Sequence, residues 1–357
     1  MTRPTYIEID LAALQHNARV TRALAGDKRV SAAVKGDAYG HGMIQCATLL
    51  AEHSDSLAVA CCEEAARLLE AGLECPVNVL EGPFDQDDAA FIVHNNLETV
   101  VHTPAQLDLL ISAKLQPTNL LWLKIDTGMH RLGLQEQELE ILIKRLEKLG
   151  HHQVGLMSHL GDAECPASEM TISQLKRWSV IAERYAFPTS LFNSAALLQS
   201  YNASSDWVRP GIMLYGASGH TNQATHEFLP VMHLNSSVMA VRHIEAGEFV
   251  GYGGRWQAPR ASRVATIPVG YGDGYPRTAI NATPVWINGD RCPLIGRVSM
   301  DMITVDVTDH PSVEAGSPVE LWGKNLPVNE VASKADTIGY ELLTRLPNRT
   351  PRRWIAP

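Results

Sequence analysis

Eight short apolar runs, separated by longer segments of helical periodicity, constrain the fold of this chain more than any other feature. The runs are rich in valine, isoleucine and leucine and lie between residue 10 and about residue 225. Strand-like and helix-like segments that alternate in this way are typical of βα units and a parallel sheet. The runs are RVSAAVK ending at Lys35, SLAVA ending at Ala60, PVNVLEG ending at Gly82, LETVVH ending at His102, LLWLKID ending at Asp126, QVGLMSH ending at His159, TSLFN ending at Asn193, and the stretch from Trp207 to Leu214.

The segments between these runs carry helix-end signals. Thr103 and Pro104 fit an N-cap and a first helical position, and Gly72 and Gly150 follow segments that fit helix C-termini. Eight βα units in this length favour a TIM-type (β/α)8 barrel, with an open doubly wound sheet as the alternative.

The pattern changes after about residue 228 to short alternating strands separated by tight turns. The candidate strands are SSVMAVRHI, RVATIPVG, TPVWI, MITVDV and VELWG, with a hairpin turn at Asn288-Gly289. We therefore predict a barrel domain over residues 1–228 and a mostly β C-terminal domain over residues 229–357. A first strand at about residues 4–10 is a candidate to pack with the C-terminal domain.

Charge and cysteine content exclude several classes of function. The 357 residues include 30 Lys and Arg against 39 Asp and Glu, a formal net charge of −9, so we expect no binding to nucleic acid or to an anionic membrane. No run approaches the ~20 apolar residues needed to span a bilayer, and no signal segment is visible, so we expect a cytoplasmic protein. The six cysteines lack C-x-x-C spacing, which argues against a disulfide framework and against a metal site.

In a TIM barrel the working residues lie at the C-terminal ends of the strands, which directs attention to Lys35. It follows SAAV and precedes GDAYGHG, with the hydroxyl of Tyr39 nearby in sequence. A lysine desolvated at a barrel end has a lowered pKa and can act as an amine nucleophile. The alternative is a lysine that extends into solvent.

Two further runs carry charge at strand ends. RPGIMLYG places Arg209 before the backbone N–H groups of Gly211 and Ile212, a setting in which TIM barrels hold phosphate, and Ser194 can add a hydroxyl. An ordinary Arg-Pro turn is the alternative. KIDTGMHRLG places the cations Lys124 and Arg131 close together, which favours an anion between them, a phenolate or a carboxylate. Salt-bridged surface cations are the alternative there.

The second domain offers two more candidates. Tyr271 lies between glycines in IPVGYGDGYPR. A tyrosine can act as a proton-transfer group only if a neighbouring group lowers its pKa from the ordinary value of about 10. GRVSMDM, by its pattern alone, predicts a strand with Met300 in the core.

Taken together, the motifs resemble the alanine racemase family, pyridoxal-phosphate enzymes whose barrel is followed by a β domain. VKGDAYGHG, LKIDTGMHRLG, SHLGDAE, NSAA, WVRPGIMLYG, VGYGG, GYGDGYPR and GRVSMDM stand in family order over nearly the whole chain. Any one of these motifs is weak, but eight in order are highly specific.

The resemblance implies a role for each matching residue. Lys35 would bind pyridoxal 5′-phosphate as a Schiff base, and Arg131 would contact the phenolic oxygen of the cofactor. Arg209 would face the pyridine nitrogen, and His159 would bridge between Arg209 and the tyrosine base. Lys124 occupies a position that some members carbamylate. The phosphate would be held by Tyr39, Asn193, Ser194, Gly211 and Ile212.

The resemblance also implies a homodimer, because Tyr271 and the substrate-contacting Met300 match residues that the family supplies from the neighbouring subunit. Lys35 would act as the base for D-alanine and Tyr271 for L-alanine, and the product would serve as a peptidoglycan precursor. One departure from the family lies near the C-terminus, where Asn348 stands in place of the tyrosine that many relatives carry.

Three other functions compete with this prediction. A racemase of broader specificity, for example for serine, would share the motifs. A non-catalytic pyridoxal-phosphate-binding barrel would lack the second domain and Tyr271. A decarboxylase of related fold would pair the pyridine nitrogen with a carboxylate, so Arg209 argues against it.

Overall fold

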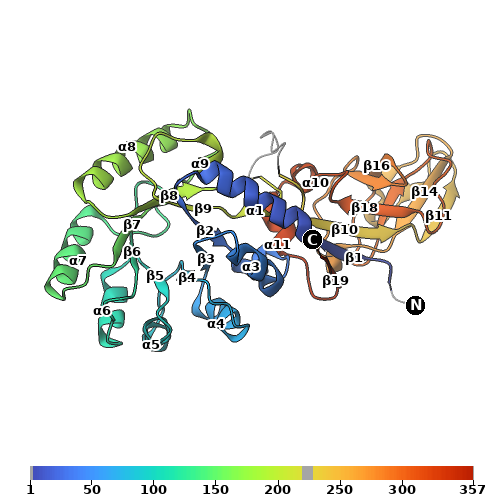
Figure 1. Cartoon of the computed structure of the whole chain (residues 1–357). Helices are drawn as coiled ribbons and strands as arrows, with labels where there is room; N and C mark the ends of the chain where they lie inside the picture. Colours follow the sequence, from blue (N-terminus) through green and yellow to red (C-terminus); the bar gives the residue numbers. More distant parts are fainter. Residues whose placement is uncertain (1–2, 219–227, 357) are drawn as a thin grey trace. The chain divides into compact units, whose positions relative to one another are not determined.

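The computed structural model of the chain describes residues 3–218 and 228–356 (Figure 1). The chain divides into two compact units, one made of Ala18–Ala38 and Gly42–Met213 and the other of Met1–Asn17, Tyr39–His41 and Leu214–Pro357. We call the first the barrel unit and the second the β unit. Within the described residues, no helix is long and apolar enough to cross a membrane.

Eight parallel strands close into a barrel in the barrel unit, which confirms the predicted TIM-type fold and excludes the open sheet. Each of the eight apolar runs found in the sequence contributes one strand. The last of these strands is shorter than its run, because Pro210 lacks an N–H group and ends the strand after Arg209. In barrel order the strands are β2 (Arg29–Ala33), β3 (Ser56–Val59), β4 (Val77–Val79), β5 (Glu98–Val101), β6 (Leu121–Lys124), β7 (Val154–Met157), β8 (Thr189–Asn193) and β9 (Trp207–Arg209).

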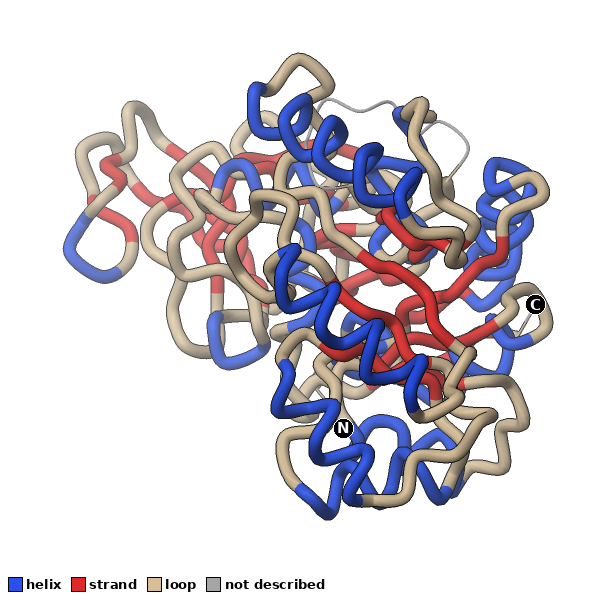
Figure 2. Tube along the Cα trace, turned by 90° about the vertical axis from the view of Figure 1, so that its left-hand side faces the viewer, coloured by secondary structure: helices blue, strands red, loops and turns tan. Residues whose placement is uncertain are grey.

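Helices connect these strands and lie around them, as Figure 2 shows with helices in blue and strands in red. The predicted helix ends are confirmed: Thr103 caps a helix that begins at Pro104, and its Oγ1 accepts a hydrogen bond of 3.3 Å from the Gln106 N–H. Gly72 and Gly150 follow two other helices in the left-handed conformation. The helices are α1 (Leu11–Ala25), α2 (Lys35–Tyr39), α3 (Met43–Ala51), α4 (Cys62–Glu70), α5 (Gln86–His94), α6 (Pro104–Ser112), α7 (Glu136–Lys148), α8 (Glu169–Arg184), α9 (Ser194–Gln199) and the 3₁₀ turn η1 (Ile212–Tyr215).

Aromatic side chains fill the barrel interior near the N-terminal ends of its strands. The Trp122 and Trp207 rings meet edge to face at 5.8 Å and pack with Val100 and Met157. A Cβ on Gly155 would lie 2.5 Å from the Trp122 ring, so the glycine makes room for the indole. The polar residues predicted for the site lie instead at the C-terminal ends of the strands.

The β unit contains a nine-stranded sheet whose order is β11-β14-β17-β16-β15-β18-β10-β1-β19. The first strand of the chain, β1, pairs antiparallel with β10 and parallel with β19. The elements are β1 (Tyr6–Asp10), β10 (Met232–Ser237), β11 (Ala240–Ile244), β14 (Ser262–Ile267), β15 (Pro284–Ile287), β16 (Asp290–Ile295), β17 (Ile303–Asp306), β18 (Pro318–Trp322), β19 (Arg352–Ile355), the separate pair β12 (Phe249–Val250) and β13 (Trp256–Gln257), the turns η2 (Tyr252–Gly254) and η3 (Tyr271–Asp273), and the helices α10 (Val328–Lys334) and α11 (Gly339–Thr344).

The strand predictions for this unit are largely confirmed, including the hairpin between β15 and β16 at Asn288-Gly289, where φ is 50° and 96°. The run SSVMAVRHI is not one strand, however. The chain leaves its pairing with β18 near Val238, whose N–H bonds the Ser317 carbonyl, and takes up pairing with β14 from Met239, whose N–H bonds the Thr266 carbonyl. The run therefore divides into the end of β10 and the whole of β11.

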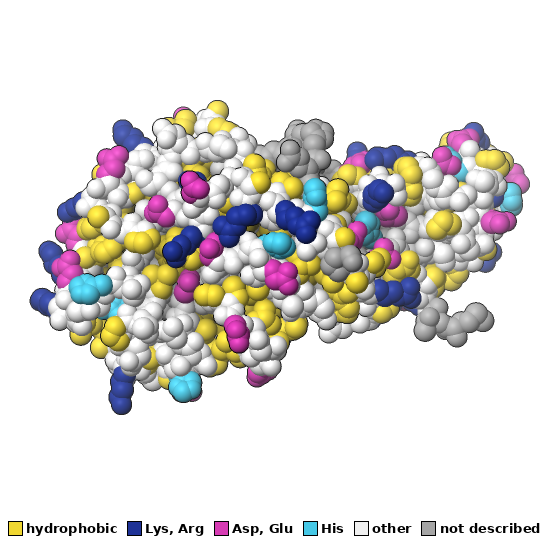
Figure 3. Space-filling view, viewed as in Figure 1, with side chains coloured by type: hydrophobic (Ala, Val, Ile, Leu, Met, Phe, Trp, Pro, Cys, Tyr) yellow, Lys and Arg dark blue, Asp and Glu magenta, His cyan; other side chains and the backbone are white. Residues whose placement is uncertain are grey.

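On the face drawn in Figure 3, positive and negative side chains are interspersed.

Candidate active site

The C-terminal ends of the barrel strands bring most of the predicted site residues to one end of the barrel unit. Lys124, Asn193 and Arg209 end β6, β8 and β9, while Lys35 and His159 follow β2 and β7 by two residues. Because the strands are parallel and the barrel is closed, all these ends lie on the same side. The predicted placement of these residues at one end of the barrel is confirmed, and their shared function stays a prediction.

The chain after Lys35 makes one left-handed turn. Gly36, Asp37, Ala38 and Tyr39 have φ values of 62°, 55°, 55° and 53°. Each non-glycine residue in this conformation costs roughly 1 kcal/mol or more, so neighbouring groups must hold the turn. The Glu64 carboxylate does so by accepting hydrogen bonds of 2.8 Å from the N–H groups of Gly36 and Ala60.

Burial lowers the pKa of Lys35 below its ordinary value. The positive charge of Arg131 acts in the same direction, while the carboxylates of Glu81 and Glu64 oppose the shift. A lowered pKa increases the fraction of free amine, which is the nucleophilic form. Lys35 therefore has the electrostatic setting of a reactive lysine rather than of a surface charge.

Arg209 is a buried cation, with an exposed fraction of 8%. It donates hydrogen bonds of 2.5 Å to the Ser190 Oγ and 2.6 Å to the Ser158 carbonyl, which fix the guanidinium in place. Burial lowers its pKa to about 10, so it stays protonated at neutral pH. Every N–H of a guanidinium is a donor, so a group that faces Arg209 can only accept from it.

His159 lies beside Arg209, with 3.5 Å between its Nδ1 and an arginine Nη2. Burial, reinforced by the charge of Arg209, holds the pKa of His159 well below its ordinary value, so the ring is neutral. Because the arginine cannot accept, Nδ1 is the acceptor and the ring proton resides on Nε2. His159 thus presents a hydrogen-bond donor on the side away from Arg209.

Lys124 and Arg131 lie on either side of a tight loop. The loop is closed by a hydrogen bond of 2.8 Å from the Leu134 N–H to the Lys124 carbonyl, and the Asp126 side chain accepts from the N–H groups of Gly128 and His130. Burial and the charges of Arg209, Arg131 and Lys35 lower the pKa of Lys124 to about 8.

Arg131 itself is exposed. No hydrogen bond or ion pair joins Arg131 to any residue that the structure describes. The alternative in which Arg131 is a salt-bridged surface cation therefore does not hold within the described residues. Its guanidinium is available to an anion.

Ser194 begins α9 and hydrogen-bonds the chain after β9. The Asn193 side chain caps α9 by accepting from the Ala196 N–H at 2.9 Å, and this places Ser194 at the first position of the helix. The Ser194 Oγ accepts from the Gly211 N–H at 2.9 Å and from the Met213 N–H at 3.4 Å. Ile212, between these two, begins η1.

Three predicted site residues belong to the β unit. Tyr39 is buried and stacks on Tyr215 with ring centroids 4.9 Å apart, and burial raises its pKa to about 12, so its hydroxyl is protonated and can donate. Tyr271 lies in η3 with an exposed fraction of 36%, and Met300 has an exposed fraction of 53%.

The prediction of a strand with Met300 in the core is wrong. The segment Gly296–Met302 connects β16 to β17, and Gly296 ends the first of these in a left-handed conformation. The carbonyls of Ser299 and Met300 accept from the N–H groups of Tyr271 and Gly272. The backbone of this segment is therefore engaged with the Tyr271 turn, and the Met300 side chain faces outward.

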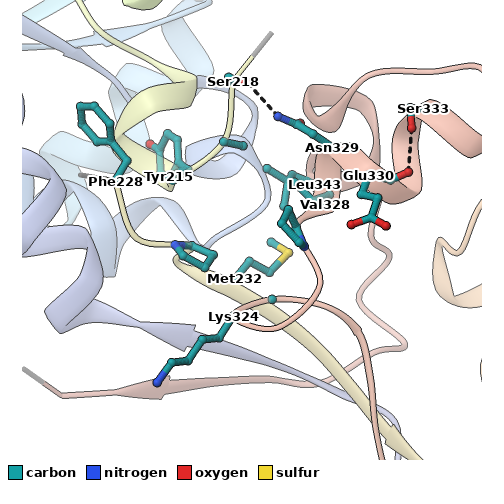
Figure 4. A pocket seen from close by; sticks show the side chains of 15 residues that line it. Tyr215, Ser218, Phe228, Met232, Lys324, Val328, Asn329, Glu330, Ser333 and Leu343 are labelled. Carbon is teal, nitrogen blue, oxygen red and sulfur yellow. Dashed lines mark hydrogen bonds between the residues drawn. The ribbon is translucent and has the colours of Figure 1, made fainter. Parts of the chain in front are cut away.

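The sequence did not single out several residues that act on the candidate residues: Glu64, Glu81, Ser158 and Ser190 in the barrel unit, and Asp273 in the β unit. An acidic residue just after a barrel strand was a usable signal for Glu81. A cavity of about 370 Å³ in the β unit, lined by residues such as Tyr215, Met232 and Asn329, contains none of the predicted site residues (Figure 4). A cavity of about 420 Å³ lined by residues such as Arg29, Trp122 and Trp207 also contains none of them, so pocket size alone would have led away from the lysine.

Comparison with known proteins agrees with the geometry. Residues 9–219 match the alanine racemase N-terminal domain, and residues 231–354 match the alanine racemase C-terminal domain. An alanine racemase from Chromohalobacter salexigens is 44% identical over 99% of this chain and 98% of its own length.

Two solved structures are also similar. The biosynthetic alanine racemase from Pseudomonas aeruginosa has a TM-score of 0.96 and 39% identity, covering 99% of this chain and all of that one. The alanine racemase from Bartonella henselae, which has covalently bound pyridoxal phosphate, has a TM-score of 0.89 and 30% identity, with 99% and 100% coverage. Fold and site thus define an amino-acid racemase, an isomerase. The chain belongs to the alanine racemase family.

Proposed function

We propose that this chain interconverts L-alanine and D-alanine, with pyridoxal 5′-phosphate held covalently by Lys35 and with Lys35 and Tyr271 as the two proton-transfer groups. The observation that carries the proposal is the cluster at the barrel end, where a lysine of lowered pKa accompanies the buried guanidinium of Arg209. Full-length similarity to alanine racemases favours alanine over the serine-directed alternative.

The residues at the barrel end fit this cofactor in charge and in hydrogen-bond chemistry. The charges of Arg131 and Arg209 act to lower the pKa of both Lys35 and Lys124, and such a cluster of cations is relieved by anions. The phosphate and the phenolic oxygen of pyridoxal phosphate are anions of this kind. Arg131 would hold the phenolic oxygen, and the phosphate would be held by Tyr39, Asn193, Ser194, Gly211 and Ile212.

When bound, pyridoxal phosphate withdraws electrons from the α-carbon of the amino acid and makes the α-proton acidic. Inversion then requires that one group removes the proton from one face and another returns a proton to the opposite face. The resemblance to the family assigns Lys35 to the D-enantiomer, and the lowered pKa of Lys35 makes its free amine accessible as a base. Tyr271 would serve the L-enantiomer.

Arg209 and His159 would support this transfer without touching the reacting proton. Arg209 would face the pyridine nitrogen and, because it can only donate, would leave that nitrogen unprotonated and so limit electron withdrawal. The neutral His159, with its proton on Nε2, would orient the hydroxyl of the tyrosine base.

We propose a homodimer with two composite sites, each taking Tyr271 and the substrate-contacting Met300 from the other copy. Several large apolar side chains of the β unit are exposed, among them Phe249, Tyr252 and Ile280 at 66%, 71% and 57%. Burying such side chains is the usual reason for stable self-association. The predicted cytoplasmic location and role in supplying a peptidoglycan precursor are part of this proposal.

An absorbance scan of the purified protein with pyridoxal phosphate, followed by chiral chromatography after incubation with L-alanine, tests the proposal. We expect a band from covalently bound cofactor and formation of D-alanine, both lost in Lys35→Ala and both kept in Lys144→Ala, which replaces an exposed lysine on α7. A band without D-alanine would overturn the assigned reaction.

Mixing two inactive variants tests the shared site. In a heterodimer of Lys35→Ala and Tyr271→Phe, one composite site regains both native residues while the other has neither. Random reassociation should therefore restore about a quarter of the native activity. No recovery after verified subunit exchange would show that both residues act within one chain.

A further inference from the structure

Tyr271 lies at the start of η3 with a side chain that reaches solvent. Its hydroxyl forms no hydrogen bond with any residue that the structure describes, and the side chain is partly exposed. Within its own chain, the hydroxyl is therefore placed by the backbone of η3, the single 3₁₀ turn from which the side chain projects. One buried aspartate in that turn organises this backbone.

Asp273 is 1% exposed and its carboxylate receives donors on both oxygens. Arg3 approaches it with both terminal nitrogens, at 2.5 Å from Oδ1 and 2.8 Å from Oδ2. Arg349 adds its Nε at 3.0 Å from Oδ1, and the Gly270 N–H donates to Oδ2 at 2.9 Å. The carboxylate is thus bound by two arginines and by the backbone at the start of the turn that carries Tyr271.

The same two arginines extend to the segment that carries Met300. Arg349 donates to the Asp301 carboxylate at 2.7 Å, and Arg3 donates to the Asp301 carbonyl at 2.8 Å. Tyr271 and Met300 are therefore connected by charged side chains in addition to the backbone hydrogen bonds between their segments.

Two glycines allow this close packing. A Cβ on Gly270 would lie 2.3 Å from the Ser299 carbonyl oxygen, and a Cβ on Gly272 would lie 2.7 Å from an Arg349 Nη1. Both distances are shorter than any side chain tolerates. At Gly270 the obstacle is backbone, so the turn can approach the Met300 segment only with glycine there, whereas at Gly272 the flexible end of Arg349 would have to shift.

We infer that Asp273, clamped between Arg3 and Arg349, is a positioning residue that fixes Tyr271 and Met300 relative to each other for proton transfer. The inference rests on the proposed role of Tyr271 as a base and names the residues that make this role possible. A displacement of about 1 Å in a proton-transfer group can cost on the order of 100-fold in rate. The network should therefore matter for transfer at Tyr271 and not for transfer at Lys35.

This asymmetry gives the test. With D-alanine in D₂O, Lys35 removes the α-proton, after which there are two outcomes. Lys35 can return a deuteron to the same face, which yields deuterated D-alanine, or Tyr271 can deliver a deuteron to the other face, which yields L-alanine. The ratio of deuterated D-alanine to L-alanine, measured by NMR and chiral chromatography, reports how well Tyr271 is placed.

We expect Asp273→Asn, Arg3→Gln and Arg349→Gln to raise this ratio, by about tenfold for the aspartate variant. Arg3→Lys keeps the charge but loses the paired contact with the Asp273 carboxylate. Its ratio of deuterated D-alanine to L-alanine should lie between those of Arg3→Gln and the native protein. A variant that only folds less well has fewer active molecules, which lowers both products together and leaves the ratio unchanged. Asp309→Asn, which breaks the exposed pair with Arg260, is the matched control and should leave the ratio at its native value.

Tyr271→Phe separates the two ways of failing. If Tyr271→Phe raises the ratio and the three network variants do not, the positioning role is wrong while the proposed base stands. If Tyr271→Phe leaves the ratio unchanged, Tyr271 is not the base and the proposed mechanism fails. Should Asp273→Asn not fold, the two arginine variants carry the test, because both arginines are partly exposed and either variant leaves the aspartate the other arginine and the Gly270 N–H.

Discussion

Lys124 offers the most quantitative prediction, because its pKa determines whether it can become an anion. Burial and neighbouring cations lower the pKa to about 8 from its ordinary 10.5. At about pH 7.5 the lower value leaves roughly a quarter of the amine neutral, whereas the ordinary value leaves about 0.1%, a difference of roughly 200-fold. Only the neutral amine can react with carbon dioxide.

In that reaction the lysine nitrogen bonds to the carbon of carbon dioxide and releases one proton, which leaves a carbamate with a negative charge. The product would replace a cation beside Arg131 by an anion, which removes a repulsion and supplies the partner that Arg131 lacks among the described residues. We therefore expect Lys124 to be carbamylated near neutral pH in the presence of bicarbonate.

The assay is ¹³C NMR of the protein in ¹³C-bicarbonate at about pH 8, the pKa given by the structure. We expect a carbamate resonance in the native protein that is absent in Lys124→Arg, since arginine cannot form a carbamate. Lys144→Arg, at an exposed position of α7, should keep the resonance. A native spectrum with no resonance that depends on Lys124, under saturating bicarbonate, would refute the argument.

Three further predictions concern the reaction and the stability of the fold. Arg209→Glu should increase transamination relative to racemisation, because a carboxylic acid can protonate the pyridine nitrogen; unchanged product partitioning by chromatography would contradict this. Burial raises the pKa of Glu98 to about 7, so its ionisation destabilises the folded state as the pH rises through that value. Glu98→Gln should therefore increase the free energy of unfolding by about 1 to 3 kcal/mol at pH 8, measured as a higher thermal midpoint, and change it little at about pH 4. Equal shifts of the midpoint at pH 8 and pH 4 would contradict ionisation of Glu98 as the cause. Gly133→Ala should cost more than ~2 kcal/mol in chemical denaturation, because φ is 144° and the new Cβ would lie 2.4 Å from the Asp126 nitrogen; a loss under ~0.5 kcal/mol would show that the loop relaxes freely.

The barrel was predictable because its signals are local. Each strand is a short apolar run with polar residues directly after it, so the placement of Lys35, His159 and Arg209 at strand ends followed from the pattern. The hairpin at Asn288-Gly289 was predictable for the same reason, since its dihedral angles depend on two adjacent residues.

The run GRVSMDM shows where local signals mislead. Its alternation predicts a strand, but the carbonyls of Ser299 and Met300 are used by the turn at Tyr271, some 28 residues earlier in the sequence, rather than by a neighbouring strand. The division of SSVMAVRHI has the same origin, because the choice of pairing partner depends on strands distant in sequence.

The sequence by itself determined the repeating βα architecture, the chemical types at the strand ends and the family. Only the tertiary structure decided how charges affect one another: the pKa of Lys124 depends on Arg131 and Arg209, and the tautomer of His159 depends on an arginine 50 residues away. It also decided that Arg3 binds Asp273 across a separation of 270 residues. Periodicity reports which face of an element is buried, whereas electrostatic coupling depends on distances through space, and folding alone sets those.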